Sequence, residues 1–382
     1  MKKWLLGIAC ASLVLTLVGC DKDNSLPPTP LSKIAPDVIH INTLWTADAG
    51  NGTAGQYLSL QPVIFGTTLA TTSYEGEVKA FNVQTGEKRW FVDMPFQIGS
   101  GAAVSQTMIV VGGLNGQVVA LASNDGHQLW AAQMASSLLA PAAISGGSVV
   151  LHVHNGDVVA LDALTGKQRW IQSSTTPALS LASNSQPVIV GKKVLVGFDN
   201  GVITAFKLNS GQIAWSRPIA IASGDTEISR MIDIVSTPVV SKGVVYAAAY
   251  HGNVVALQLK NGSLLWEHPF SSYTNLALAS DRLIATDDAG AVSALDLETG
   301  RVLWVQKALL QRSVTAPAVV NTNDVIVGDY AGYVHWLSLS DGSLLARTQI
   351  SGKGIIAQAA VANGVAFVVS NNGDLVALKP SK

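Results

Sequence analysis

A few side chains in this sequence could carry chemistry. His152 and His154 are two residues apart, which places them on one face of a strand where their imidazoles could bind a metal, but no third ligand can be identified. Asp157, Asp162 and Asp296 offer calcium ligands, yet each occupies a turn or strand position of a recurring pattern, where aspartate commonly stabilises the turn itself. No motif selects a serine or cysteine nucleophile. The sequence therefore favours a binding protein over an enzyme.

Cys20 is the one residue whose context predicts a covalent modification. A short positive region, Met1-Lys2-Lys3, precedes an apolar run at residues 4–18 that is too short to span a membrane, so residues 1–19 are predicted to be a signal peptide. The stretch Leu-Val-Gly-Cys at residues 17–20 resembles the bacterial lipobox, in which the cysteine is acylated. We expect a lipid on Cys20, and no disulfide in the mature chain.

Residues 20–40 are predicted to be a lipid-anchored tether. They contain four prolines and no apolar period, and at about 3.1 Å per residue they could hold the domain of residues 41–382 about 60 Å from the bilayer. The formal charge is −1, and −3 once Lys2 and Lys3 leave with the signal peptide, so there is no basic field. The sequence thus argues against nucleic-acid binding, and the lipid is the only membrane contact expected.

The body of the chain is one unit that recurs eight times. Each copy begins with x-Gly-x-apolar-x-Ala; in most copies a second turn glycine follows ten residues after the first, and a tryptophan four residues later. The first glycines are Gly76, Gly116, Gly156, Gly201, Gly252, Gly290, Gly332 and Gly373. The tryptophans are Trp90, Trp130, Trp170, Trp215, Trp266 and Trp304. The seventh copy has Ala346 at the tryptophan position and Trp336 at the alanine position.

These units predict the fold. Each holds four short runs rich in β-branched and small apolar residues, separated by turns whose glycines supply the positive φ that hairpins need. A four-strand unit of roughly 40 residues is typical of a propeller blade, whereas helical repeats would show a 3.6-residue period that is absent. The predicted fold is all-β, an eight-bladed β-propeller with four antiparallel strands per blade. The tryptophans are predicted to fill the space between blades.

The two ends of the chain predict how the ring closes. The eighth unit ends at Lys382 before an outer strand can form, while residues 41–47, which carry Trp45, are a strand without a unit. We expect this N-terminal strand to complete the last blade, because closure removes the exposed strand edges that invite aggregation.

Two consecutive connections between repeats are unusually long, at residues 171–186 and 216–237. Equivalent connections share one rim of a propeller, so these two should lie side by side. They supply the candidate partner-binding residues Leu179, Leu181, Glu227, Arg230 and Asp233. Leucines flanked by charged groups suit a protein-binding patch. The alternative is that the leucines pack under their own loop and the charges pair locally.

The repeat Ala-x-Asp-x-x-Thr-Gly-x-x-x-Trp, present at residues 160–170 and 294–304, resembles the PQQ-type propeller repeat. With the Cys20 motif, Leu-Ser-Leu at 179–181 and Gly-x-Thr-Glu-Ile-x-Arg at 224–230, the mature chain is similar to the BamB family, lipoproteins of the outer-membrane β-barrel assembly (BAM) machinery. The resemblance implies a non-enzymatic scaffold without a cofactor, anchored in the outer membrane and facing the periplasm. Such a scaffold would bind the POTRA domains of BamA and other BAM components, and assist unfolded outer-membrane proteins.

The same resemblance implies that Leu179, Leu181 and Asp233 face BamA. The sequence departs from the family pattern at Ala182, where the family has arginine, and at Val235, where it has an acidic residue. Asp21 after the acylated cysteine resembles an inner-membrane retention signal of some bacteria. The alternative function is a quinone (PQQ)-dependent dehydrogenase on the same repeat. It would need a calcium site and a vicinal cysteine pair; the sequence singles out no such site and has no such pair.

Overall fold

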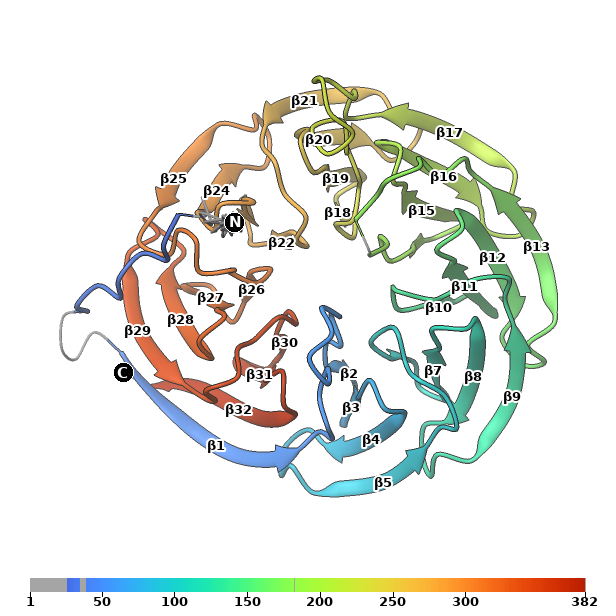
Figure 1. Cartoon of the computed structure of the whole chain (residues 1–382), viewed down its shortest axis with the longest axis horizontal. Helices are drawn as coiled ribbons and strands as arrows, with labels where there is room; N and C mark the ends of the chain where they lie inside the picture. Colours follow the sequence, from blue (N-terminus) through green and yellow to red (C-terminus); the bar gives the residue numbers. More distant parts are fainter. Residues whose placement is uncertain (1–25, 35–38, 182, 382) are drawn as a thin grey trace, which may run out of the picture.

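The computed structural model describes residues 26–34, 39–181 and 183–381, so the predicted signal peptide and Cys20 lie outside the described residues. Every regular element in these ranges is a β-strand, and the strands form eight four-stranded antiparallel sheets. Figure 1 shows the sheets arranged as blades in a ring around a common centre. The predicted eight-bladed β-propeller is confirmed. No described segment is a helix with the length and apolarity needed to cross a membrane.

The first four blades run in chain order from the inner to the outer strand. Blade 1 contains β2 (Val63–Phe65), β3 (Thr68–Thr72), β4 (Glu77–Asn82) and β5 (Lys88–Asp93). Blade 2 contains β6 (Ala103–Val104), β7 (Met108–Gly112), β8 (Gln117–Ala122) and β9 (Gln128–Gln133). Blade 3 contains β10 (Ala143–Ser145), β11 (Ser148–His152), β12 (Asp157–Asp162) and β13 (Gln168–Ser173). Blade 4 contains β14 (Val188–Val190), β15 (Lys193–Gly197), β16 (Val202–Lys207) and β17 (Ile213–Pro218).

The next three blades follow the same order, and the last one differs. Blade 5 contains β18 (Val239–Ser241), β19 (Val244–Ala248), β20 (Asn253–Gln258) and β21 (Leu264–Pro269). Blade 6 contains β22 (Ala277–Leu278), β23 (Arg282–Thr286), β24 (Val292–Asp296) and β25 (Val302–Gln306). Blade 7 contains β26 (Ala318–Val319), β27 (Asp324–Gly328), β28 (Tyr333–Ser338) and β29 (Leu344–Gln349). Blade 8 contains β30 (Ala360–Ala362), β31 (Val365–Val369), β32 (Asp374–Ser381) and, as its outer strand, β1 (His40–Asp48).

The N-terminal strand closes the ring. β1 pairs antiparallel with β32 along its length, from His40 opposite Ser381 to Asp48 opposite Asp374 (Figure 1). At the end of β1, the Asp48 carboxylate lies 3.0 Å from Lys79 Nζ in blade 1, so this strand also bridges to the next blade. The predicted closure is confirmed, and the strand is slightly longer than residues 41–47.

Tryptophans on the outer strands join neighbouring blades, as expected from their spacing. The indole Nε1 of each of the six repeat tryptophans donates to a backbone carbonyl of the following blade at 2.7–3.1 Å. The ring lies against the turn glycine of that blade; a Cβ built on Gly86, Gly126, Gly166, Gly211, Gly262, Gly300 or Gly342 would lie within 2.7 Å of a tryptophan. Trp45 makes this contact with Gly86, so β1 supplies the tryptophan that packs against blade 1.

Blade 7 inverts the arrangement. In the first six blades an alanine of the third strand stands opposite the tryptophan of the fourth, as Ala80 does opposite Trp90, whereas in blade 7 Trp336 stands opposite Ala346. Trp336 is fully buried and packs among residues of β31 and β32. Blade 8 has no glycine turn between its last two strands, because β32 and β1 are opposite ends of the chain. At this interface the tryptophan is therefore supplied by the third strand of blade 7, as Trp336.

Deleting residues 40–48 should abolish cooperative unfolding, because it exposes the edge of β32 and removes Trp45 from its contact with Gly86. Thermal unfolding followed by circular dichroism would measure this. The matched control deletes residues 26–34, which pair with no strand and should leave a sharp transition. An equally sharp transition in both variants would contradict closure by β1.

Candidate partner-binding site

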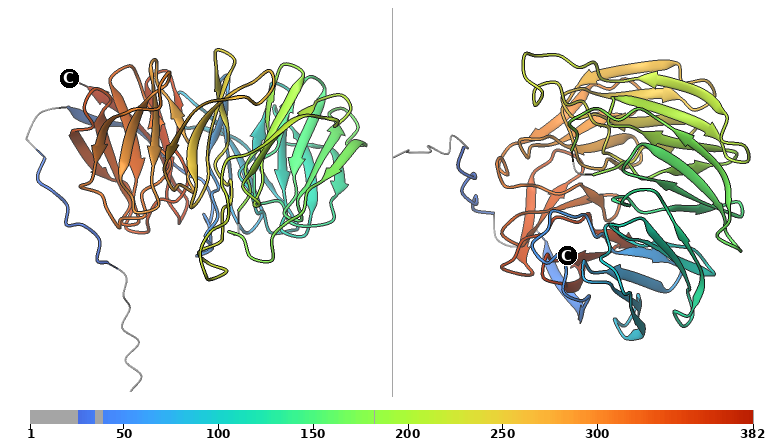
Figure 2. Two further views of the ribbon diagram at one scale, coloured as in Figure 1. Left: turned by 90° about the horizontal axis from the view of Figure 1, so that it is seen from above. Right: turned by 45° about the vertical axis from the view of Figure 1, so that its right-hand side comes forward.

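The two long connections lie side by side on one face of the propeller. Residues 174–187 link β13 to β14, and residues 219–238 link β17 to β18. The backbone N–H of Leu181 donates to the Asp233 carboxylate at 3.1 Å, and the Ser185 hydroxyl donates to the Ser236 carbonyl at 3.0 Å. Figure 2 shows a loop of the second connection projecting beyond its neighbours. The prediction that these connections are adjacent is confirmed.

Apolar side chains are exposed on both connections. Leu179 is 42% exposed, and Ile221 and Ile228, which the sequence reading did not single out, are 83% and 64% exposed. Leu181 is half-buried. Exposed large apolar side chains on two adjacent connections are typical of a surface that another protein covers. The alternative in which both leucines pack beneath their own loop therefore does not hold for Leu179.

Glu227 and Arg230 are exposed and flank Ile228 in the chain, on a short turn of the second connection. The turn is held by Thr226 and Ser229, whose hydroxyls bond each other at 3.0 Å, and the N–H of Arg230 donates to the carbonyl of Thr226 at 3.1 Å. Within the described residues neither Glu227 nor Arg230 forms an ion pair, so both charges are available to a partner. We define the loop patch as Leu179, Ile221, Glu227, Ile228 and Arg230.

Asp233 has a different place from the other candidate residues. Its side chain is fully buried, and it accepts the N–H of Leu181, so from this position it does not reach a partner directly. It instead fixes the backbone beside Leu181. Val235, at the position where the family pattern has an acid, is half-buried, and Ala182 lies outside the described residues.

A second buried carboxylate lies under the first connection, and sequence analysis missed it. Asp199 is 4% exposed. Burial is the main cause that raises its pKa to about 7, repulsion from Asp233 adds to it, and a hydrogen bond with Ser180 acts in the opposite direction. Burial also raises the pKa of Asp233. Each carboxylate keeps one buried oxygen without a hydrogen-bond partner. In the sequence, Asp199-Asn200-Gly201 looks only like a turn, so no local signal marks this pair.

The two histidines support the same connection. His152 is buried, and its Nδ1 lies 3.0 Å from the carbonyl of Ser185, while His154 Nδ1 lies 3.3 Å from Asn184 Oδ1. Burial lowers the pKa of His152 to about 4, so the ring is neutral near pH 7. Within the described ranges no three His, Cys, Asp or Glu residues gather in an arrangement that could hold a metal ion. The histidines are thus explained by contacts to residues 184–185.

Leu181 also borders a cavity of about 430 Å³ that is lined by connections from around the ring. Its described lining includes Tyr57, Tyr273 and Tyr330, several amide side chains and no charged residue. Burial and the proximity of Tyr57 raise the pKa of Tyr273 to about 12, so its phenol stays protonated. A neutral surface of this kind can contact a neighbouring polypeptide.

Comparison of the sequence with known proteins assigns the chain to a family. The sequence model of the family described as "Outer membrane protein assembly factor BamB" matches residues 74–306 and 289–382. The chain belongs to the BamB family. The family's assembly factor from Legionella pneumophila is 45% identical over 94% of this chain and 93% of its own length. The Escherichia coli (strain K12) assembly factor is 33% identical over 96% of each chain.

Solved structures agree. The crystal structure of BamB from Moraxella catarrhalis superposes with a TM-score of 0.81 and 26% identity, covering 89% of this chain and all of that one. A quinohemoprotein alcohol dehydrogenase from Comamonas testosteroni gives a TM-score of 0.70 at 12% identity, over 88% of this chain and 76% of its own. At that identity the likeness shows the propeller fold alone. The family likeness therefore favours an assembly factor over the dehydrogenase alternative.

Replacing Asp199 by Asn should stabilise the protein increasingly as the pH rises. The folded state retains the Asp199 proton to about pH 7, whereas an unfolded carboxyl loses it near pH 3.8, so the wild-type free energy of unfolding falls between these values. An amide cannot ionise. The advantage of the variant should therefore grow by on the order of 1–3 kcal/mol between pH 5 and pH 8.

Urea unfolding at both pH values would measure this difference. The matched control is Asp225→Asn, at an exposed aspartate of the second connection, which should leave the pH dependence unchanged. Identical pH dependence in wild type and Asp199→Asn would contradict a protonated Asp199.

Proposed function

We propose that this chain is a lipid-anchored, non-enzymatic scaffold of the BAM machinery, and that its loop patch binds the POTRA domains of BamA. Membership of the BamB family supports the assembly role. The lipid would be carried by Cys20 and would hold the propeller at the outer membrane, on the periplasmic side. Other BAM components and unfolded outer-membrane proteins are further proposed contacts.

One observation carries the proposed binding surface. The loop patch combines three exposed apolar side chains with two charges that have no ionic partner among the described residues, and Asp233 fixes the two connections to each other beneath it. A pre-formed surface loses little conformational freedom on binding, so more of the contact energy remains as affinity. Asp233 would then act as a positioning residue that holds the Leu181 backbone, and it would contact no partner atom itself.

The non-enzymatic role is part of the proposal. The relatives named above are called assembly factors, and the quinoprotein likeness rests on fold alone. Incubation of the purified chain with calcium, the quinone and alcohol or sugar substrates should give no oxidation above that of the free cofactor. Sustained turnover would overturn this part and would favour the dehydrogenase alternative.

The double variant Leu179→Glu, Leu181→Glu should weaken capture of purified BamA POTRA domains at least tenfold. Introducing two charges into an apolar contact leaves them desolvated and unpaired, and each tenfold loss corresponds to about 1.4 kcal/mol. The dissociation constant can be measured by calorimetry. Because Leu181 is half-buried, Ile228→Glu provides a second variant at an exposed position, with the same expected direction.

Leu164→Glu is the matched control. Leu164 is 85% exposed in the turn between β12 and β13, at the opposite end of β13 from residues 174–187. Its replacement should leave POTRA affinity unchanged. Unaltered affinity in both loop variants, or an equal loss in the control, would overturn the assigned surface.

A further inference from the structure

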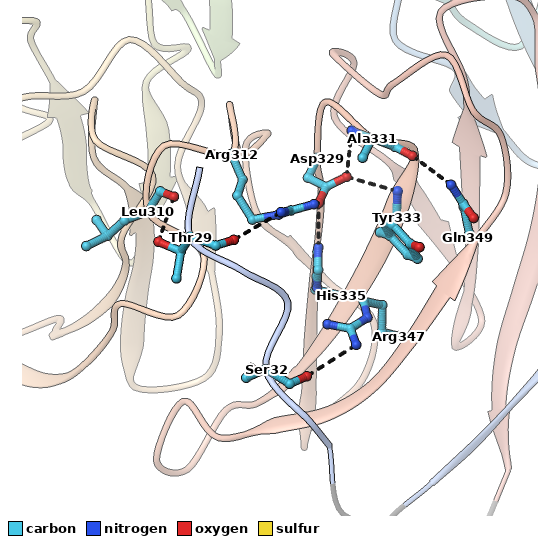
Figure 3. Close-up of polar contacts among 10 residues, drawn as sticks. All are labelled: Thr29, Ser32, Leu310, Arg312, Asp329, Ala331, Tyr333, His335, Arg347 and Gln349. Atoms are coloured by element: carbon cyan, nitrogen blue, oxygen red, sulfur yellow. Dashed lines mark hydrogen bonds and ion pairs between the residues drawn. The ribbon is translucent and has the colours of Figure 1, made fainter. Parts of the chain in front are cut away.

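The described part of the tether, residues 26–34, lies against the outside of blade 7 and the connection that precedes it (Figure 3). Thr29 is the central contact: its backbone N–H and its hydroxyl both donate to the carbonyl of Leu310, at 3.0 and 2.9 Å. Pro27, Pro28 and Pro30 surround it, and proline favours an extended backbone. The tether therefore meets the propeller in a conformation that its own sequence prefers.

Two arginines bind the carbonyls of the same segment. Arg312 Nη1 donates to the Thr29 carbonyl at 3.1 Å, and Arg347 Nη2 donates to the Ser32 carbonyl at 3.2 Å. Both guanidinium groups also lie over aromatic rings, Arg312 over Tyr330 at 5.1 Å and Arg347 over Tyr333 at 5.5 Å. The rings limit the rotation of the guanidinium groups, which keeps their donors directed at the tether.

A buried cluster fixes Arg312 from behind. Arg312 is 4% exposed, and its side chain pairs with the Asp329 carboxylate through Nε at 2.8 Å and Nη2 at 2.7 Å. Asp329 also accepts His335 Nε2 at 3.0 Å and the N–H groups of Ala331 and Tyr333 at 2.9 and 3.0 Å (Figure 3). Nε and Nη2 of this buried arginine are thus directed at Asp329, and the Thr29 carbonyl of the tether accepts an N–H of the third nitrogen, Nη1.

The contacts also give the segment a direction. Arg347 belongs to β29 on the outside of blade 7, whereas Leu310 and Arg312 belong to residues 307–317, the connection from β25 to β26. This connection is equivalent to residues 174–187 and 219–238, so it lies on the same face as the loop patch. Followed toward the N-terminus, the chain passes Ser32 on β29 and then reaches that face at Thr29. Figure 2 shows this course along the side of the disc.

We propose that residues 26–34 are a docking strap that brings the lipidated end of the chain to the face carrying the loop patch, so that the anchored propeller turns this face toward the bilayer. The orientation rests on the proposed lipid at Cys20. Between Cys20 and Leu26 the chain can span only about 20 Å, against about 60 Å for a free tether. The docked strap thus shortens the free part of the tether and fixes the edge of the propeller at which it begins.

The docking is tested on the soluble mature chain, without a membrane. Thr29→Pro removes both donors to Leu310 and changes no residue of the propeller, and Thr29→Ser keeps both. Trypsin should cut after Lys33 about tenfold faster in Thr29→Pro than in wild type, because cleavage follows the population of the undocked strap, and Thr29→Ser should behave as wild type. Mass spectrometry identifies the product. Equal cleavage rates in all three proteins would overturn the docking.

The orientation is tested with the acylated protein on vesicles that carry an energy-transfer acceptor in the lipid headgroups. A single donor dye is placed through Ile221→Cys on the loop face or through Leu164→Cys at the opposite end of β13; the mature chain has only Cys20 otherwise, which the lipid occupies. Transfer should be stronger from position 221 than from position 164, and Thr29→Pro should abolish the difference.

The outcomes separate the two proposals. Equal transfer from both positions, in wild-type protein that floats with the vesicles, would overturn the orientation and leave the lipid anchor intact. Protein that fails to float would overturn the lipid anchor and with it the orientation, while the trypsin experiment still decides whether the strap docks.

Discussion

The contact between a tryptophan of one blade and a glycine turn of the next is the constraint on which the rest of this structure depends. It joins blades that share no backbone hydrogen-bond ladder, because each sheet pairs only within itself. The glycines serve two purposes at once: their φ lies between +69° and +78°, and a Cβ would collide with the indole ring. The repeat therefore encodes the packing between blades as well as the turns within them.

Ring closure modifies that rule at one interface only. Where β32 and β1 leave no glycine turn, Trp336 moves the indole to the third strand and Ala346 fills the vacated site. Trp45 keeps the ordinary arrangement on the other side of the closure, over Gly86. The ring is thus closed although the chain has two free ends, and this frame holds the long connections on one face, where they also hydrogen-bond to each other.

Three buried carboxylates position groups on that face. Asp233 holds the backbone beside Leu181, Asp199 lies under the same connection, and Asp329 holds the arginine that receives the strap. The exposed loop patch is proposed to contact a partner, whereas these buried carboxylates position neighbouring groups. The strap then places the proposed anchor and the proposed partner surface on one face of the propeller.

The sequence by itself determined the number of blades, the strand order, the closure by the N-terminal strand and the adjacency of the two long connections, because all four follow from spacing along the chain. It also identified Leu179, Glu227 and Arg230 as surface candidates. Only the tertiary structure decided that Asp233 is buried, that Asp199 shares its environment, that Ile221 and Ile228 are exposed, and that Thr29 meets Leu310. These features arise from contacts between residues far apart in the chain, where burial and hydrogen-bond geometry leave no periodic trace in the sequence.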